Sequence, residues 1–495
     1  MKREFERIDG FLRQWSEHSG PYLIHANRVI TYQQAFRCVE KAEALLRSLD
    51  ITRQNVGLFA DNSIEYVLGY FVNMFSRNTN IPINVKLTDY EIKAELKYCD
   101  CNWVLCKEEF IARIKTIRSE MPLGIISINP AGEFTVIHHS ETSARRENND
   151  DIAVMLHTSG TMGNPKKVML THGNLAANTQ SNIDSLELHG KDVVLVALPL
   201  FFGYCHTAQF LTHTRLGGSI VIFDEPIFTA KRFCSLVQDY HVTCFTAVPT
   251  MLALIEKYKY LSNYKLEHLR YICFGGGNVS LTMLGSLINK LPNAGIVQTY
   301  GQTECSPRVT ALLPGDSIRK LGSVGKAIPG VEIQVVNDAD EPVGAGKIGE
   351  IRVRGKNTTI GYYKNPGETA KIKKGEWHYT GDLAKEDDEG YVYLVGRKKN
   401  VIISGGMNIY PEEIESVIAS FEGIDDVLVK PETDDLLGEI VAAEIVLKSP
   451  AEFSQLELET FMKTRLAPYK IPKRYYIRKA LPKTSTGKKQ RCNVN

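Results

Sequence analysis

Apolar runs of strand length alternate with amphipathic stretches of helix length over the first part of the chain, from about Tyr22 to Asn293. Strand-length apolar runs occupy residues 55–60, 193–198 and 219–223. Residues 32–49 and 229–239 have the spacing of amphipathic helices. The alternation predicts an α/β fold with largely parallel sheets.

The pattern changes beyond about Val324, where Gly, Pro and short alternating runs such as 331–336 and 349–354 predict a small β-rich unit. An apolar run at 391–395 is followed by a polar break at 396–400. A last α/β unit follows, with a helix expected to begin at Pro411. We therefore place a domain boundary near Lys399.

The composition is that of a globular protein with several domains. The chain has 495 residues, of which 43% are hydrophobic and 23% charged, and its formal net charge is +2. The length suggests about three domain-sized units. Near-neutrality argues against a dedicated nucleic-acid binder. No apolar run is long enough to span a membrane, and the longest, 66–75, is interpreted as a buried helix.

The spacing of the cysteines does not indicate a metal site, and the basic residues are concentrated near the end of the chain. Ten cysteines occur without a CxxC pair, and the cluster Cys99, Cys101 and Cys106 lacks a second ligand pair at zinc spacing. Reduced thiols in the cytosol are the preferred interpretation, and the charged N-terminus does not resemble a secretory signal. Residues 463–491 hold eleven Lys or Arg and no Asp or Glu. Such a stretch is compatible with an RNA or anionic-lipid patch or with a solvated basic face.

Two stretches carry residue types suited to phosphate and magnesium. Residues 154–168 run from an apolar strand into a loop rich in Gly and hydroxyls that ends on Lys166. Backbone N–H groups and hydroxyls of such a loop can surround a phosphate, although the spacing is not that of a Walker A loop. In the stretch 298–304, Glu304 follows Thr303 and is a candidate Mg²⁺ ligand. An ordinary turn is the alternative for each stretch.

Two later stretches suit a nucleotide as well. In residues 377–383, Asp382 can accept hydrogen bonds from two ribose hydroxyls, and Arg397 can pair with phosphate. The alternative for Asp382 is a turn or helix cap. In residues 481–491, Lys488 follows Gly487 near the C-terminus, where a lysine is normally solvated.

These four stretches occur in an order that resembles the adenylate-forming superfamily, which contains acyl-CoA synthetases, adenylation domains of peptide synthetases and beetle luciferases. Three weaker stretches, 274–278, 361–366 and 469–473, fall in the expected order as well. The similarity covers nearly the whole chain. It implies a fold with a large N-terminal ATP- and acid-binding domain, residues 1–395, made of two α/β subdomains and a small β-rich subdomain. It also implies a hinge at 396–400 and a small mobile α+β C-terminal lid domain, residues 401–495.

The resemblance implies a role for each matching residue. The loop over the ATP β- and γ-phosphates corresponds to Thr158, Ser159, Gly160, Thr161, Gly163 and Lys166. The adenine site corresponds to Gly276, Gly277, Asn278 and Tyr300. Thr303 matches the α-phosphate contact, Glu304 the Mg²⁺ ligand, Asp382 the ribose contact with Arg397 beside it, Lys399 the hinge and Lys488 the catalytic lysine.

The implied reaction uses ATP and Mg²⁺ to convert a carboxylic acid to acyl-AMP with release of pyrophosphate. The acyl group then passes to a phosphopantetheine thiol, which belongs either to CoA or to an acyl carrier protein acting in trans. The expected location is the cytoplasm, with no nucleic-acid partner and no membrane span.

The sequence departs from the family pattern in four places, one of which is Asn400, where an acidic residue beside the hinge is usual. Met162 replaces a hydroxyl residue, Lys167 replaces Gly and is expected to add a charge near the phosphates, and Phe202 replaces a His that gates the thiol tunnel in many acyl-CoA synthetases. Residues 201–206 contain no carboxylate that could pair with a substrate ammonium. We therefore expect an aliphatic or aromatic acid without an α-amino group. Candidate pocket walls, each equally compatible with core packing, are Phe202, Tyr204, Gly275 and Cys305.

Other functions stay open at this point. The chain is also compatible with an amino-acid adenylating enzyme that loads a carrier protein in trans, and with a non-catalytic nucleotide-binding module. Adenylation followed by oxidation, as in luciferases, has no specific support in the sequence.

Overall fold

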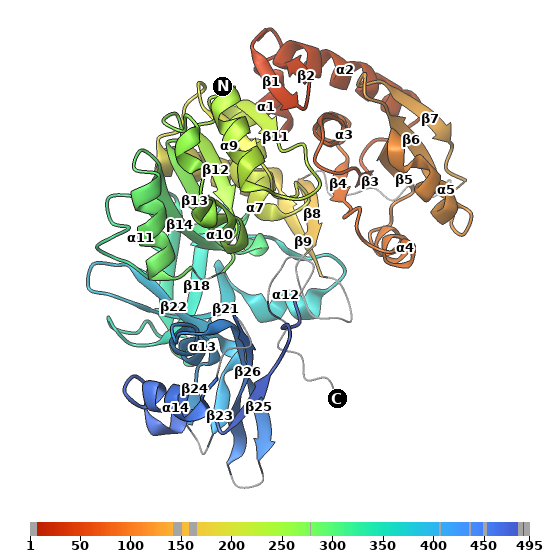
Figure 1. The fold of residues 1–495 in the computed structure, drawn as a ribbon. Helices are drawn as coiled ribbons and strands as arrows, with labels where there is room; N and C mark the ends of the chain where they lie inside the picture. The colour runs from red at the N-terminus through yellow and green to blue at the C-terminus, as the bar shows by residue number, and fades with distance from the viewer. Residues whose placement is uncertain are drawn as a thin grey trace. The chain divides into compact units, whose positions relative to one another are not determined.

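The computed structural model describes residues 7–141, 151–157, 166–277, 279–404, 407–434, 437–448, 453–483 and 489. The chain forms two compact units (Figure 1). The first comprises Met1–Glu332 and Val353–His378, and the second comprises Ile333–Arg352 and Tyr379–Asn495. The α/β fold class predicted from the alternating pattern is confirmed.

The first unit contains two large sheets. One has nine strands in the order β16 (Lys326–Ala327), β15 (Arg308–Leu312), β14 (Gly295–Gly301), β13 (Tyr271–Phe274), β12 (Cys244–Ala247), β10 (Val193–Val196), β11 (Ser219–Ile222), β1 (Pro21–His25) and β2 (Arg28–Thr31). The other has eight, in the order β19 (Gly361–Tyr362), β9 (Lys167–Thr171), β8 (Ile152–His157), β4 (Thr79–Pro82), β3 (Asn55–Phe59), β5 (Trp103–Lys107), β6 (Gly124–Ile128) and β7 (Phe134–His138). Both sheets are parallel in the middle and antiparallel towards the edges, as with β14–β15 and β6–β7.

Helices connect these strands and cover the sheets. Those of the first unit are α1 (Asp9–Arg13), α2 (Tyr32–Ser48), α3 (Ile64–Phe75), α4 (Asp89–Tyr98), α5 (Ile111–Arg118), α6 (His172–Leu186), α7 (Gly203–Cys205), α8 (Thr212–Leu216), α9 (Ala230–Asp239), α10 (Pro249–Lys257), α11 (Leu281–Lys290) and α12 (Pro366–Ile372). A π-helix, η3 (His206–Leu211), joins α7 to α8. The apolar run 66–75 lies in α3, whose twelve residues are all buried, as expected.

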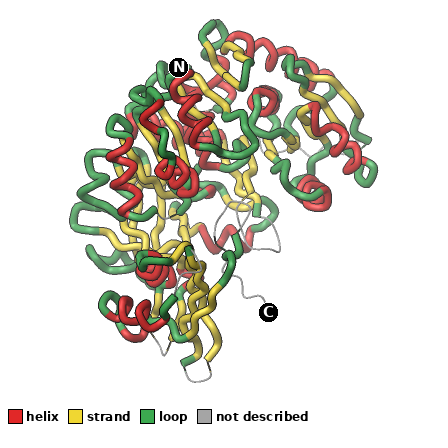
Figure 2. The backbone as a smooth tube through the Cα atoms, viewed as in Figure 1, coloured by secondary structure: helices red, strands yellow, loops and turns green. Residues whose placement is uncertain are grey.

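The second unit is richer in strands than in helices (Figure 2). Most of a five-stranded sheet belongs to it, with β17 (Val331–Val336), β18 (Gly349–Gly355), β21 (Trp377–Glu386), β20 (Lys373–Lys374) and β22 (Val392–Arg397). A second five-stranded sheet contains β24 (Met407–Ile409), β23 (Ile402–Ser404), β26 (Gly438–Leu447), β25 (Ile424–Asp434) and β27 (Arg474–Ile477). Its helices are α13 (Pro411–Ala419) and α14 (Gln455–Lys463), and α13 begins at the predicted Pro411.

Side-chain alternation along the nine-stranded sheet creates two cores. Leu195 of β10 packs with Phe245 and Ile272 against α9, α10 and α11. Its neighbours Val194 and Val196 point to the opposite face and join the larger core, which contains side chains of the eight-stranded sheet. Because strand side chains alternate between the faces, each strand contributes to both cores and fixes the layer order.

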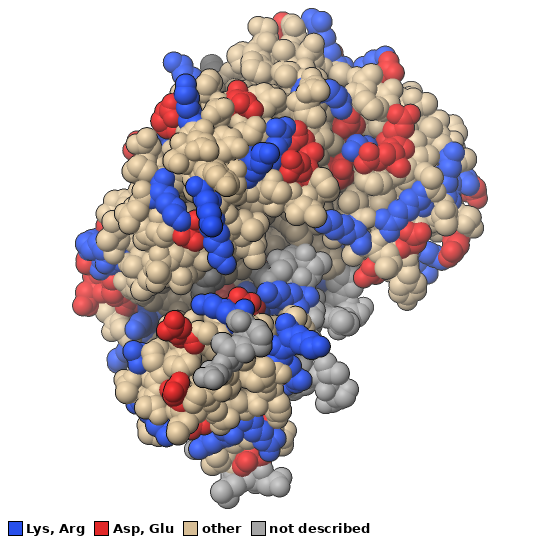
Figure 3. Space-filling model, viewed as in Figure 1, with Lys and Arg blue, Asp and Glu red and all other residues tan. Residues whose placement is uncertain are grey.

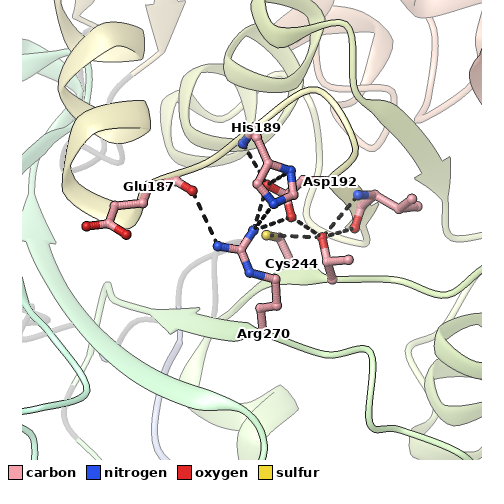
Figure 4. A network of polar contacts seen from close by, with 7 residues as sticks. Glu187, His189, Asp192, Cys244 and Arg270 are labelled. Atoms are coloured by element: carbon pink, nitrogen blue, oxygen red, sulfur yellow. Dashed lines mark hydrogen bonds and ion pairs between the residues drawn. The ribbon is translucent and has the colours of Figure 1, made fainter.

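A buried charge network holds the amino ends of β10, β12 and β13 together (Figure 4). Arg270 Nη1 donates to both oxygens of the fully buried Asp192 at 2.7 and 2.9 Å. The Thr243 hydroxyl donates to Asp192 Oδ1 at 2.7 Å, and the His189 amide donates to Oδ2 at 2.8 Å. Burial works to raise the pKa of Asp192, but these hydrogen bonds outweigh it and hold the pKa below its usual value.

Four buried histidines of the first unit predict that the protein loses stability in mild acid. Burial lowers the pKa of His172, His206 and His378 to about 3, and that of His213 to about 4. Between these values and pH 6.5 the unfolded chain binds more protons than the folded one, so stability falls as the pH falls. Each buried histidine is expected to cost at most about 1.4 kcal/mol per pH unit in this window.

Urea denaturation at pH 7.5 and pH 5 measures this loss. His206→Gln is expected to flatten the pH dependence, while His139→Gln, at an exposed position, is expected to leave it unchanged. Equal stability of the wild type at both pH values contradicts the prediction.

Among the described residues, no helix is long and apolar enough to cross a membrane.

Candidate active site

The candidate site of the first unit lies where the parallel strands β10, β12, β13 and β14 end. In a parallel sheet the segments that follow the strand carboxyl ends meet along one edge, which is where ligands bind in such folds. The segments here begin at Ala197, Val248, Gly275 and Gln302. Of the stretches singled out in the sequence, 274–278 and 298–304 reach this edge, and 154–168 runs from β8 to β9.

Thr303 and Glu304 form the short 3₁₀-helix η5 (Thr303–Cys305) directly after β14. Glu304 is only 8% exposed, and its Oε1 accepts a hydrogen bond of 2.7 Å from the Tyr362 hydroxyl. The Thr359 amide donates to the Glu304 carbonyl at 2.7 Å. The first contact orients the carboxylate of Glu304, and the second holds its backbone.

Lys166 approaches the same tyrosine from the β8–β9 hairpin. Its ammonium lies 5.2 Å from the centre of the Tyr362 ring and pairs with Glu368 of α12. Lys166 and Lys371 lower the pKa of Glu368 to about 2. The structure thus brings the predicted phosphate lysine and the predicted magnesium carboxylate to one tyrosine. The other predicted phosphate-loop residues, Thr158, Ser159, Gly160, Thr161 and Gly163, lie outside the described residues.

The predicted adenine segment follows β13. Gly276 has a φ of +79° and Gly277 lies beside Pro249, where an added Cβ would be 3.1 Å from the proline ring. Glycine adopts such a positive φ without strain, so this turn favours glycine. Tyr300 is buried near the end of β14, and Asn278 lies outside the described residues.

Two of the four predicted pocket residues meet through a third residue that the sequence did not single out. The Tyr204 and Thr299 hydroxyls are hydrogen-bonded at 2.7 Å, and a Cβ added to Gly275 would lie 2.9 Å from Thr299 Oγ1. Phe202 packs on Phe201, with ring centres 4.5 Å apart. The Cys305 carbonyl accepts from Asn357 Nδ2 at 2.9 Å, which indicates a structural contribution.

Arg308 is the charged residue of this region that sequence reasoning missed. It opens β15 opposite Gly301 and is only 2% exposed. Burial raises the pKa of the Tyr204 hydroxyl, and the Arg308 guanidinium opposes that rise. Nothing in the sequence marks this arginine as buried, because its position depends on how β15 folds back on β14.

The expected extra charge of Lys167 near the phosphates is wrong. Its side chain is fully buried and its ammonium pairs with Glu95 of α4. Burial works to lower the pKa of Lys167, but Glu95 outweighs it and the pKa is raised. The Lys-for-Gly difference therefore ties the β8–β9 hairpin to α4 through a buried ion pair.

In the second unit, Asp382 and Arg397 face each other on adjacent strands. They are direct partners in the β21–β22 ladder, and Arg397 Nε lies 2.6 Å from Asp382 Oδ1. Asp382 therefore lies within a strand, and the alternative of a turn or helix cap is wrong. A carboxylate oriented by a neighbouring guanidinium can accept hydrogen bonds from a pair of hydroxyls.

The expected hinge also lies within the second unit. Within the expected hinge 396–400, Gly396 and Arg397 are the last residues of β22, and the 3₁₀-helix η6 (Lys398–Asn400) follows. The exposed Lys399 is flanked by Lys398, which pairs with Asp338 and Glu350. Motion about residues 396–400 stays a prediction.

Acidic side chains form ion pairs with five of the basic residues in the stretch 463–491. The ion pairs are Lys470–Glu413, Arg474–Glu432, Arg478–Glu444, Lys483–Asp426 and Lys489–Asp426. Both signs of charge are also interspersed over the face that Figure 3 shows. This pairing favours a structural use of the basic residues over an RNA-binding patch.

Asp426 holds the two described ends of the segment that contains Lys488. Lys483 and Lys489 form a β-bridge with each other, and their ammonium groups lie 3.0 and 2.7 Å from the Asp426 carboxylate. Burial works to raise the pKa of Asp426, but the two lysines outweigh it. Lys488 itself lies outside the described residues.

We expect Asp426→Asn to slow acyl-AMP formation by about tenfold, because a loosened segment positions Lys488 poorly. The matched control is Glu432→Gln, which weakens the pair of Arg474 with Glu432 in the same unit. Acyl-AMP formation is measured by pyrophosphate exchange, and unchanged exchange in Asp426→Asn contradicts the positioning role.

The described residues are suited to a Mg²⁺ ion that takes most of its ligands from the phosphate oxygens of a nucleotide. They contain no cluster of three or more His, Cys, Asp or Glu side chains that could hold a metal by itself. Mg²⁺ characteristically takes one or two carboxylates together with phosphate oxygens, and Glu304 supplies one oriented carboxylate. In the cysteine cluster, Cys99, Cys101 and Cys106 are buried, and burial raises the pKa of Cys99 to about 12.

Comparison with known proteins decides the family. Residues 13–363 match the AMP-binding enzymes, and residues 413–488 match the AMP-binding enzyme C-terminal domain. The chain belongs to the AMP-binding enzyme family. This confirms the adenylate-forming resemblance and the AMP-forming acid–thiol ligase class.

The relatives of this AMP-binding enzyme are named CoA ligases. A 2-succinylbenzoate–CoA ligase from Oceanobacillus iheyensis is 30% identical over 94% of both chains. A feruloyl-CoA synthase from Amycolatopsis sp. is 30% identical over 94% of this chain and 93% of the relative. The o-succinylbenzoate CoA synthetase of Bacillus subtilis, solved with ATP and magnesium, is 27% identical with a TM-score of 0.85 and covers 98% of both chains. The predicted use of ATP and Mg²⁺ agrees with that complex.

Proposed function

We propose that this AMP-binding enzyme converts a carboxylic acid without an α-amino group to acyl-AMP and then to its CoA thioester. The observation that carries the proposal is the arrangement of Lys166, Tyr362 and Glu304 beside Thr303 at the carboxyl edge of the nine-stranded sheet. Family membership and relatives that are named CoA ligases support the reaction type. Cytoplasmic location stays a prediction.

The roles of the described residues follow from their chemistry. Lys166 supplies positive charge for the outer phosphates, and Glu304 would hold Mg²⁺, which supplies charge neutralisation on the phosphates when bound. Thr303 offers a hydroxyl to the α-phosphate, and Asp382 offers a carboxylate to the ribose hydroxyls. Outside the described residues, Lys488 would bridge the attacking carboxylate and the α-phosphate, which repel each other as anions.

We propose an acid without an α-amino group because the described residues around Tyr204 include no carboxylate that could pair with a substrate ammonium. The charged neighbour there is Arg308, a cation, which would repel a substrate ammonium. The amino-acid adenylating alternative is therefore disfavoured.

Pyrophosphate exchange over a panel of carboxylic and amino acids, with ATP and Mg²⁺, tests the proposal. We expect exchange with at least one acid that lacks an α-amino group, and none with its α-amino analogue. Folded enzyme that shows no exchange with any acid overturns the proposal in favour of a non-catalytic nucleotide-binding module. Thioester formation with CoA, compared with a phosphopantetheinylated carrier protein, then decides the acceptor.

A further inference from the structure

We propose that Arg308 binds a second carboxylate of the substrate, so that this enzyme activates a short dicarboxylic acid. The inference rests on the proposed function and names the substrate class of the same site. It comes from one feature of the first unit, a buried arginine that has no anionic partner among the described residues.

The electrostatics of Arg308 are unusual for a buried residue. Among the described residues, its buried Nε and Nη1 atoms have no hydrogen-bond partner and no carboxylate pairs with it, and the groups that the guanidinium reaches, the Tyr204 hydroxyl and the Cys273 thiol, are uncharged. A guanidinium stays charged inside proteins, and burying it without an anion is costly. Lys167, the other buried Lys or Arg among the described residues, has such a partner in Glu95. An anionic group of a bound substrate would supply the missing partner of the guanidinium and offset this cost.

The described neighbours of Arg308 are uncharged, and they include Tyr204, which is predicted to line the acyl pocket. Its guanidinium influences the Tyr204 hydroxyl and the Cys273 thiol, and in both groups it opposes the pKa rise caused by burial. Tyr204 in turn bonds Thr299 beside Gly275. Two hydroxyls and a guanidinium with unsatisfied N–H groups are therefore gathered where a carboxylate could accept a charge-assisted hydrogen bond from Arg308 and another from a hydroxyl.

The distance between the two ends of the site favours a short acid. Gly203 faces Thr303, since a Cβ added to it would lie 3.6 Å from Thr303 Cγ2, and the next residue, Tyr204, faces Arg308. Consecutive Cα atoms are only about 3.8 Å apart. The Tyr204–Thr299 hydrogen bond and the close approach of Thr299 to Gly275 bring the side chains at this end close together. An acid of a few carbons, with carboxylates at both ends, matches this spacing.

The test compares acids that differ only in the second carboxylate. Malonate, succinate and glutarate are compared with propionate, butyrate and valerate in CoA thioester formation. We expect the best diacid to exceed its matched monoacid in kcat/KM by about a hundredfold or more, because a site built to bind a polar group rejects the analogue that lacks it. Arg308→Met is expected to remove this preference, and Arg308→Lys to keep part of it.

Folding of the variants is measured separately by urea denaturation. A methionine replaces an unpaired charge with an apolar side chain, so Arg308→Met is expected to unfold at the same or a higher urea concentration. If Arg308→Met does not fold, the diacid preference of the wild type and of Arg308→Lys, measured with the matched acid pairs, still tests the inference. A wild type that prefers monoacids, or an Arg308→Met variant that keeps the diacid preference, overturns this inference and leaves the proposed ligase function standing. No activity with any acid instead overturns the proposed function.

Discussion

Replacing Lys488 by alanine is expected to lower the rate of acyl-AMP formation by about a hundredfold to a thousandfold. A carboxylate that attacks the α-phosphate must overcome the repulsion of two anions, and removing a single preorganised charge or donor at such a centre typically costs about 10²–10³ in rate. Pyrophosphate exchange measures the effect. Lys479→Ala, at an exposed lysine of the same basic stretch, is the matched control and is expected to keep full exchange.

The same variant separates the two half-reactions. In the proposed mechanism Lys488 acts in adenylation, whereas the thiol attacks an acyl-AMP that is already formed. Thioester formation from supplied acyl-AMP is therefore expected to stay within about threefold of the wild type, because it does not use this charge. Equal losses in both half-reactions would contradict the separate role of the lysine.

Replacing Arg270 by methionine is expected to cost about 3 kcal/mol of folding stability. The variant leaves the fully buried Asp192 without its cation, and removing one partner of a buried pair typically costs about 3–5 kcal/mol. We take the lower value because the Arg270 side chain is 32% exposed and water partly screens the pair. Urea denaturation measures the loss.

Two further variants make this measurement specific. The double variant Arg270→Met with Asp192→Asn is expected to be more stable than Arg270→Met alone, because the unpaired charge is gone. Arg319→Met breaks the more exposed pair with Asp316 and is expected to cost about 1 kcal/mol or less. Similar losses from Arg270→Met and Arg319→Met count against the stabilising role of the network.

Much of the fold followed from local pattern. Runs of apolar residues become strands and spaced apolar residues become helices because burial of those side chains drives both. The predicted helix at 32–49 is α2, which ends one residue earlier, and the strand at 193–198 is the shorter β10. Element ends were less predictable, since they depend on caps such as the Thr31–Gln34 capping box.

The candidate site, too, could be predicted from the sequence only in part. Its motif residues could be named from sequence, because Lys166, Thr303, Glu304, Asp382 and Lys488 stand in short stretches of recognisable order and composition. Their partners could not be named, since Tyr362, which contacts Glu304, lies 58 residues further along the chain. Hydrogen bonds between distant segments form only when the sheets assemble.

The sequence by itself determined that this chain is an α/β protein of the adenylate-forming type. The tertiary structure decided what individual charges do. Lys167 looked like a phosphate contact and proved to be a buried partner of Glu95. Arg308, which the sequence did not single out, is buried beside Tyr204 with no anionic partner among the described residues. The reason is physical: the energy of a charge depends on its burial and on its nearest opposite charge, and both are set by residues distant in sequence.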